Sequence, residues 1–323
     1  MLLFSSCNKI NFRTGSFPEV ATNLNRVNSI YDEMNSDIPM INQNLAILYS
    51  SNSASKGQQF NIEGSLIIFN WDQENGILSQ GAIDGVSSVL SNLKSWVKNT
   101  ETESNERGPY SFFDDQNVQL LLFSRDNVEG IYSIYAEPEK ANSSPKTRTN
   151  QNFQIFEGSA SEMYPSFYGK NFLKGADINS QGKPEKMLFS SDKDGAFDIY
   201  ELGIPSNVSV MNYLNDSAPK SPTKISINSS DNDHMPFIYG DMLVFASDRP
   251  GGLGGYDLYY AFKIASGWSD PVNFGPSINS AQDEYRPVVS DHPDFSNRLM
   301  IFSSNRPGGL GGFDLYYVGI PKF

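Results

Sequence analysis

SDRPGGLGGYDLYY, at residues 247–260, returns almost letter for letter as SNRPGGLGGFDLYY at residues 304–317, and SDKDGAFDIY at residues 191–200 is a shorter copy. Each copy places a turn between a short apolar segment and a segment rich in aromatic residues, which is the pattern of a β-hairpin. The turns are rich in glycine because tight reversals need positive φ angles, which glycine adopts at little cost. Hairpins that repeat about every 50–70 residues are typical of the blades of a β-propeller.

The hairpin template fits five segments of the chain. In each, an aromatic residue is followed three residues later by Asp or Asn, and the pairs are Tyr49 and Asn52, Phe123 and Asp126, Phe189 and Asp192, Phe245 and Asp248, and Phe302 and Asn305. A proline suited to the first position of a strand precedes each hairpin, at Pro39, Pro109, Pro165, Pro236 and Pro287. The sequence therefore predicts an all-β fold, a five-bladed β-propeller. A sixth blade is the alternative, because residues 71–100 are long enough to hold further strands.

The two ends of the chain predict how the ring closes. Few residues follow the fifth hairpin, so the last blade lacks an outer strand, while residues 27–33 resemble residues 278–284 between the last two hairpins. We therefore expect the N-terminal stretch to supply the missing strand, which removes exposed sheet edges. Residues 16–323 form a single propeller domain on this interpretation, and residues 1–15 are a lipoprotein signal remnant and tether.

The longest departure from the repeat is the insertion at residues 71–100 in the first blade. Within it, apolar residues recur at helical spacing, at Val86, Leu90, Leu93 and Val97. We expect a helix whose apolar face packs against the side of the propeller. The alternative is that the same face binds a partner protein.

The single cysteine, Cys7, follows Leu-Phe-Ser-Ser, a pattern that resembles a bacterial lipobox. There the signal peptide is cleaved before the cysteine and the sulfur is lipidated, so the lipid on Cys7 would tether the protein to a membrane. Only six residues precede Cys7, which is short for a signal sequence, and a free thiol on a frayed terminus is the alternative. Residues 8–12 carry no acidic residue, which favours the periplasmic side of the outer membrane over the cell surface.

Charge and composition exclude several classes of partner and site. The formal net charge of −13 disfavours nucleic acid and anionic lipid as partners, because like charges repel. One cysteine excludes a disulfide framework and a cysteine-based zinc site. Neither of the two histidines, His234 and His292, has another His or Cys close in sequence, so no metal site is predicted from them.

Acidic residues recur at two places in the repeat. One set lies three residues before the strand prolines, at Glu106, Glu162, Asp233 and Glu284, and Ser36 takes that place in the first blade. We interpret these acids as caps of local turns. The alternative is a ring at one mouth of the channel that binds calcium, the one cofactor that the sequence suggests.

The second set of acids flanks the glycine-rich turns, at Asp192, Asp198, Asp248, Asp257 and Asp314. A turn-stabilising residue obeys the symmetry of the repeat, whereas a catalytic residue breaks it. We therefore interpret these aspartates as structural, and no catalytic residue is predicted.

The block FxSxRPGGxGGxDLY, preceded by DEYRP and followed by WSDPVNFG, resembles the WD40-like propeller repeat of the TolB class, in the variant abundant in Bacteroidota envelope proteins. The resemblance is specific for the last two repeats and faint for the first two. It is similar to the propeller of the PorE lipoprotein of a secretion system, without the other domains of that protein. The resemblance implies a non-catalytic interaction platform. Asp216-Ser217-Ala218 likewise resembles the O-glycosylation site of Bacteroidota proteins, which implies that Ser217 would carry the glycan.

The expected function is therefore that of a non-catalytic outer-membrane lipoprotein, a scaffold or subunit of a cell-envelope complex whose partner is another envelope protein. The alternative is a carbohydrate-binding or glycoside-hydrolase-type propeller, which the aromatic content of 13% favours. Inner-strand runs such as Pro-Tyr-Ser-Phe-Phe at residues 109–113 carry no acids, which disfavours a glycosidase. Clustered carboxylates inside the channel would favour the alternative.

Overall fold

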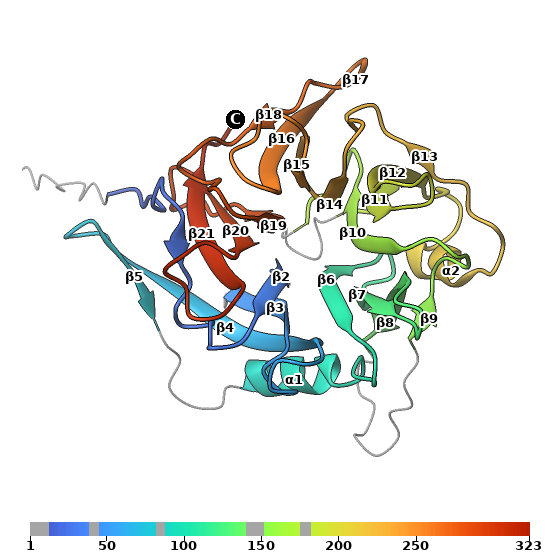
Figure 1. The fold of residues 1–323 in the computed structure, drawn as a ribbon, viewed down its shortest axis with the longest axis horizontal. Coiled ribbons are helices and arrows are strands. Elements are labelled where there is room, and N and C mark those ends of the chain that lie inside the picture. The colour runs from blue at the N-terminus through green and yellow to red at the C-terminus, as the bar shows by residue number, and fades with distance from the viewer. Residues whose placement is uncertain (1–12, 39–44, 82–87, 140–151, 175–181) are drawn as a thin grey trace, which may run out of the picture.

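The computed structural model describes residues 13–38, 45–81, 88–139, 152–174 and 182–323. These residues form five antiparallel sheets arranged as blades around one axis, and Figure 1 views the ring along that axis. The prediction of an all-β, five-bladed propeller is confirmed. The described part of the insertion at residues 71–100 holds the end of a first-blade strand, a short fourth strand and a helix, and no sixth blade.

Each blade runs from an inner strand near the axis to an outer strand at the rim. Blade 1 contains β2 (Glu33–Asp37), β3 (Leu45–Ser51), β4 (Asn61–Asp72) and β5 (Ile77–Gly81). Blade 2 contains β6 (Glu106–Phe113), β7 (Gln119–Asp126), β8 (Tyr132–Pro138) and β9 (Phe153–Gln154). Blade 3 contains β10 (Glu162–Tyr168), β11 (Lys186–Ser191), β12 (Asp198–Gly203) and β13 (Thr223–Lys224).

Blade 4 contains β14 (Asp233–Tyr239), β15 (Met242–Ser247) and β16 (Asp257–Ile264), with β17 (Gly267–Trp268) and β18 (Val272–Asn273) both paired to β16. Blade 5 contains β19 (Glu284–Ser290), β20 (Arg298–Ser304) and β21 (Asp314–Ile320), and its outer strand is β1 (Thr22–Asn23). In the register of that last pair, Thr22 lies opposite Tyr317 and Asn23 opposite Tyr316. The predicted closure by an N-terminal outer strand is therefore confirmed.

The second strand of each blade is a continuous apolar run because its sheet is covered on both sides by the neighbouring blades. In β15 the run Met242-Leu243-Val244-Phe245 is fully buried. An aromatic pair joins the second and third strands at equivalent positions, such as Phe245 with Tyr259, whose rings stack with centroids 6.0 Å apart. Rings and branched side chains from all five blades merge into one large core.

The glycine-rich turns of blades 4 and 5 dock on the chain that enters the next blade. Only the first glycine of each turn has a positive φ, at Gly251 and Gly308. A later glycine is needed for close approach, because a Cβ atom on Gly311 would lie 1.8 Å from the carbonyl oxygen of Tyr31. Both conformational freedom and the absence of a side chain therefore explain the repeated glycines.

Helix α1 (Ser88–Val97) lies across the side of blades 1 and 2 (Figure 1). Leu93 and Val97 are 2% and 3% exposed and pack, together with Trp96, against side chains of β3, β4 and β7. The propeller therefore occupies these two residues of the predicted partner-binding face. Val86 and the side chain of Leu90 lie outside the described residues.

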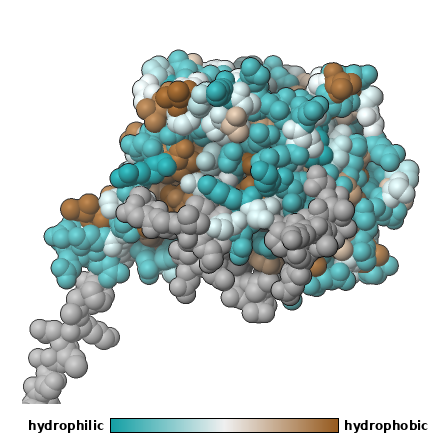
Figure 2. Space-filling view, turned by 90° about the horizontal axis from the view of Figure 1, so that it is seen from below, coloured by the Kyte–Doolittle hydropathy of each residue, from teal (hydrophilic) through white to brown (hydrophobic). Residues whose placement is uncertain are grey.

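Figure 2 views the molecule from the side on which α1 lies, and its described surface is mostly hydrophilic, with hydrophobic residues in small groups.

Helix α2 (Val210–Asn215) is the other helix of the described residues. Ser209 caps its N-terminus, since the Ser209 hydroxyl accepts a hydrogen bond from the backbone N–H of Asn212. Neither helix is long and apolar enough to span a membrane.

Candidate active site

An acidic residue begins the inner strand of every blade. The five residues, here called the acid ring, are Glu33, Glu106, Glu162, Asp233 and Glu284. They occupy the same register position, since each lies opposite the corresponding residue of the second strand, as Glu33 does with Ser51 and Glu284 with Ser304. Because the inner strands surround the axis (Figure 1), the ring lies on one face of the propeller, here called the acid face.

The residue predicted for the first blade of this ring was wrong. Glu33, not Ser36, is the equivalent of the four predicted acids, and Ser36 stands where the other inner strands have proline. The misplacement arose because blade 1 lacks the proline from which the position was counted. Pro39, which was used instead, lies outside the described residues.

Four members of the acid ring are buried and held by side chains on both sides. A Ser or Thr hydroxyl four residues upstream donates to each carboxylate, as Ser280 does to Glu284 at 2.6 Å. The second strand, or the turn directly after it, supplies another donor, which is Ser51 for Glu33, Arg125 for Glu106, Arg249 for Asp233, and both Ser304 and Arg306 for Glu284. These contacts are those of carboxylates that fix the entry into each blade. The described residues contain no group of three or more metal-ligating side chains that could hold a cation.

Glu162 in blade 3 departs from this pattern. The residue four positions upstream is Gly158, which has no hydroxyl, and the strand partner Ser191 accepts from the backbone N–H of Lys193 but donates no hydrogen bond to Glu162. Within the described chain no donor reaches its Oε2 atom, which is buried although the residue as a whole is only half-buried. Burial, reinforced by the nearby Asp192 carboxylate and opposed by Lys193, raises the pKa of Glu162 to about 7.

Asp192, the second acid of blade 3, has also lost a partner. In the other four blades a carboxylate and an amide join these positions; the pairs are Asn52 with Asp32, Asp126 with Asn105, Asp248 with Asn232, and Asn305 with Asp283. In blade 3 the partner position holds Ser161, and its backbone N–H donates to Asp192 Oδ1 at 2.7 Å. No side chain among the described residues donates to Asp192. Blade 3 thus presents two interacting carboxyls without the side-chain hydrogen-bond donors that the other blades supply at these positions.

Half-buried aromatic rings lie beside the acid ring. This aromatic rim comprises Tyr132, Phe197, Tyr256, Tyr285 and Phe313. Backbone hydrogen bonds hold three of these rings next to the acids. The N–H of Glu33 donates to the carbonyl of Phe313, that of Asp233 to Phe197, and that of Glu284 to Tyr256. The rings also touch one another: Tyr285 stacks on Phe313 at 5.1 Å and meets Tyr256 edge-on at 5.3 Å.

Two residues past the acids, every inner strand turns through a positive φ. The residues concerned are Asn35, Gly108, Tyr164, Met235 and Arg286. The Tyr164 ring lies so close to Gly108 that a Cβ atom there would be 2.4 Å from it, which explains the glycine. His234, beside Met235, stacks on Phe197 at 4.0 Å, and burial together with Arg286 lowers the pKa of His234 to about 3. These side chains fill the axis behind the acid face.

Deeper along the axis lies a buried charge cluster. Arg286 is fully buried and donates to the carbonyl oxygens of Tyr164, Pro165 and Pro236, while Lys174 forms an ion pair with Asp37 at 2.9 Å. The expectation of acid-free inner strands is therefore wrong: each of the five begins with an acid, and β2 also ends in Asp37. Because Asp37 is fully buried and paired, it is not available to a substrate.

The remaining predicted residues lie at scattered places. Asp248, Asp257 and Asp314 accept backbone N–H groups of adjacent loops or turns, and Asp198 pairs with Lys224. Ser217 is exposed, so its predicted glycosylation meets no steric barrier. Cys7 lies outside the described residues.

Two signals in the sequence mark the site that the sequence analysis missed. Gly158 stands where the other blades have Ser or Thr, and Ser161 stands where they have Asn or Asp. Both are departures from the repeat, but they become visible only after the first blade is aligned on Glu33.

Comparisons with known proteins give a consistent fold. No protein-family model matches this sequence, and no curated protein matches it. Among solved structures, a thermostable family-43 glycoside hydrolase has a TM-score of 0.55 and 14% identity over 91% of both chains. An endo-arabinase from Bacteroides thetaiotaomicron has a TM-score of 0.53 and 13% identity, covering 95% of this chain and all of its own.

A family-62 α-L-arabinofuranosidase catalytic domain from Coprinopsis cinerea has a TM-score of 0.52 and 11% identity, over 95% of this chain and 96% of its own. TolB from Acinetobacter baumannii is also among the similar structures, but its TM-score of 0.36 supports no inference. At these identities the likenesses establish the propeller fold and not an activity. The expectation of a non-catalytic scaffold that is not an enzyme is contradicted to this extent: it depended on likeness to TolB, whereas the structures with a TM-score above 0.5 named here are glycoside hydrolases, so the fold gives no ground for preferring a scaffold.

Proposed function

We propose that this protein is a carbohydrate-active propeller of the glycoside-hydrolase type, with Glu162 and Asp192 as its catalytic carboxyls on the acid face. The observation that carries the proposal is the release of both carboxyls from the partners that hold their equivalents in the other blades. A catalytic pair must differ from the equivalent residues of the other blades, whereas residues with a structural role follow the repeat. Blade 3 differs at two neighbouring positions. The full-length likeness to glycoside hydrolases supports the substrate class.

Hydrolysis of a glycosidic bond uses one carboxyl as proton donor and a second as base or nucleophile. Glu162 is the donor, because with a pKa of about 7 it retains a proton at neutral pH, where an ordinary glutamate is ionised. Asp192 is the second carboxyl, and its charge helps to keep Glu162 protonated. Glu162 Oε2 makes no hydrogen bond within the described chain but is buried, so the side chain must rotate toward the acid face to give its proton to the leaving oxygen.

The aromatic rim provides the binding surface in this proposal. The C–H faces of sugar rings pack on aromatic side chains, and hydroxyl groups at the ring edge remain free for polar contacts. Tyr256, Tyr285 and Phe313 form a continuous aromatic surface across blades 4 and 5, within reach of an extended chain that also passes Glu162. Arg107, whose guanidinium lies 4.2 Å from the Phe60 ring centre, adds a cation on the side of blades 1 and 2.

The test is hydrolysis of a panel of polysaccharides with arabinan first, since the names of two similar structures concern arabinose polymers. Release of reducing ends is measured for the wild type, Glu162→Gln and Asp192→Asn. We expect a loss of about 100-fold or more in each variant, as is usual for removal of an acid or base. Glu129→Gln, an exposed turn residue, and Asp248→Asn, the blade 4 equivalent of Asp192, are the matched controls and should retain activity.

The proposal fails if the wild type neither binds nor cleaves any glycan of the panel. It also fails if both blade 3 variants hydrolyse the substrate at the wild-type rate. Binding without cleavage, abolished by Tyr285→Ala, would retain the glycan surface and remove the catalytic part of the proposal.

A further inference from the structure

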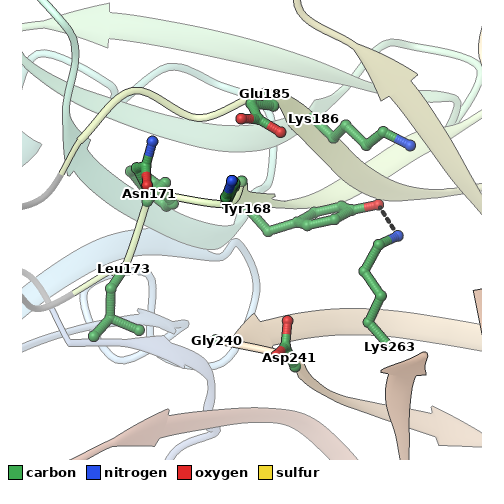
Figure 3. Close-up of a pocket in the computed structure, with 11 residues that line it drawn as sticks. Tyr168, Asn171, Leu173, Glu185, Lys186, Gly240, Asp241 and Lys263 are labelled. Atoms are coloured by element: carbon green, nitrogen blue, oxygen red, sulfur yellow. Dashed lines mark hydrogen bonds between the residues drawn. The ribbon is translucent and has the colours of Figure 1, made fainter. Parts of the chain in front are cut away.

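A cavity of about 590 Å³ lies between blades 3 and 4 on the face opposite the acid face. Its walls are the segment after β10, the start of β11, the turn between β14 and β15, and Lys263 of β16 (Figure 3). The cavity exists because blade 4 turns back tightly at Gly240 and Asp241, with a φ of 60° at the glycine, while blade 3 connects the equivalent strands through residues 169–185. The size is within the usual range for small-molecule sites.

One wall of the cavity is a fixed polar network. The hydroxyl of Tyr168 donates to Glu201, which also pairs with Lys186. Lys263 Nζ donates to the same Tyr168 oxygen at 3.2 Å, as the dashed line in Figure 3 shows. The Tyr168 ring is therefore held at one orientation at the edge of the cavity.

Lys263 has binding capacity that this network does not use. Its ammonium group carries three N–H donors, of which one reaches Tyr168. Lys186 has a carboxylate partner in Glu201, but within the described ranges no carboxylate lies close enough to form an ion pair with Lys263. Its Nζ atom lies 4.9 Å from the ring centres of both Tyr168 and Trp268, so two aromatic faces fix its position.

Other lining groups suit hydroxyls, and one of them, Asp241, lies beside Lys263, whose backbone N–H donates to the Asp241 carbonyl at 2.8 Å. The exposed side chains of Asn171 and Asp241 line the cavity and provide an amide and a carboxylate, while Leu173 adds an apolar surface (Figure 3). A ligand that has both a carboxylate and hydroxyl groups would satisfy Lys263 together with these neighbouring polar groups. A fully apolar ligand would leave these polar groups unpaired, which is unfavourable.

We infer that this cavity binds a sugar acid, with the uronate carboxylate on Lys263 and the sugar hydroxyls on Asn171 and Asp241. The site is separate from the catalytic carboxyls of the proposed function and lies on the other face of the propeller. It would hold an acidic unit of a glycan or a charged branch. Burial lowers the pKa of Lys263 in the free protein, and an anionic ligand reverses that effect.

The test uses the methyl glycosides of D-glucuronic and D-galacturonic acid as ligands and methyl glucoside and methyl galactoside as neutral counterparts. Saturation-transfer NMR detects binding, and calorimetry measures it for the wild type, Lys263→Met and Lys98→Met, a charge-matched control directly after α1. We expect at least one uronide to bind, at least tenfold more tightly than its neutral counterpart, and Lys263→Met to weaken it at least tenfold. Lys98→Met and Glu162→Gln should bind like the wild type.

The inference is overturned if neither uronide binds, if neutral and acidic sugars bind equally, or if Lys263→Met binds normally. Thermal melting of each variant checks that the fold is intact. Because Glu162→Gln removes only the proposed catalysis and Lys263→Met only uronide binding, failure at one site is distinguishable from failure at the other.

Discussion

Blades 3 and 4 share the pairing of their first two strands and an acid at the same position, yet the contacts that this acid makes differ. Asp233 of blade 4 is fully buried and is bound by Ser229 and Arg249. Glu162 of blade 3 is half-buried and has Gly158 and Lys193 at those places, neither of which reaches it by a hydrogen bond. The difference teaches that a symmetric fold can carry a functional group simply by omitting the contacts that neutralise it elsewhere.

The largest effect expected from this comparison is on stability at blade 4. Arg249→Met leaves the Asp233 carboxylate buried without its ion-pair partner, which typically costs about 3–5 kcal/mol. Lys193→Met at the equivalent place in blade 3 should cost less than about 1 kcal/mol, because this exposed side chain contributes only a surface contact with the Tyr200 ring. Urea unfolding of the two variants measures both values. Equal destabilisation would contradict the proposed difference between the blades.

An intermediate effect is expected from pH on Glu162→Gln. The pKa of Glu162 rises from 4.5 to about 7 on folding, so the unfolded chain releases this proton at lower pH than the folded protein. The wild type should therefore lose stability relative to Glu162→Gln as pH rises from about 4.5 to 7, and the difference should stay constant above that range. Melting temperatures at pH 5, 6, 7 and 8 measure the difference. A stability difference that does not depend on pH would refute the assignment.

The smallest effect is expected from rebuilding the missing contacts. Gly158→Ser places a hydroxyl where Ser229 stands in blade 4, and no atom lies within 4 Å of the position that its Cβ would take. The new hydrogen bond should stabilise the protein by about 1 kcal/mol at neutral pH and lower the pKa of Glu162. The alkaline limb of the pH–activity profile should then move to lower pH. An unchanged profile together with unchanged stability would show that the absent hydroxyl is not what frees Glu162.

Several features followed from the sequence because they are local or repeated. The hairpin repeats ending in Tyr260 and Tyr317 predicted strands and turns correctly, since alternating apolar and glycine-rich segments have few other solutions. Closure by the N-terminal strand also followed from the missing outer strand of blade 5, and pairing of Thr22 with Tyr317 confirmed it.

The candidate site did not follow, although its residues were named. Asp192 was assigned to turn stabilisation because its position recurs, and the loss of its amide partner at Ser161 went unnoticed. Glu33 was missed because blade 1 replaces the marker proline by Ser36, so the five-fold comparison that isolates Glu162 was incomplete. Function was misjudged for a related reason, since likeness to one repeat family says little about which loops and carboxyls a propeller carries.

By itself the sequence determined the architecture: five similar hairpin units cannot bury their apolar faces alone and must stack around an axis. Only the tertiary structure decided which carboxyls are free. Burial and partner geometry set the pKa of Glu162, and both depend on side chains brought together from different strands and loops. The cavity at Lys263 likewise arises from a short turn in blade 4 beside a long connection in blade 3, a contact between segments about 70 residues apart that no local pattern encodes.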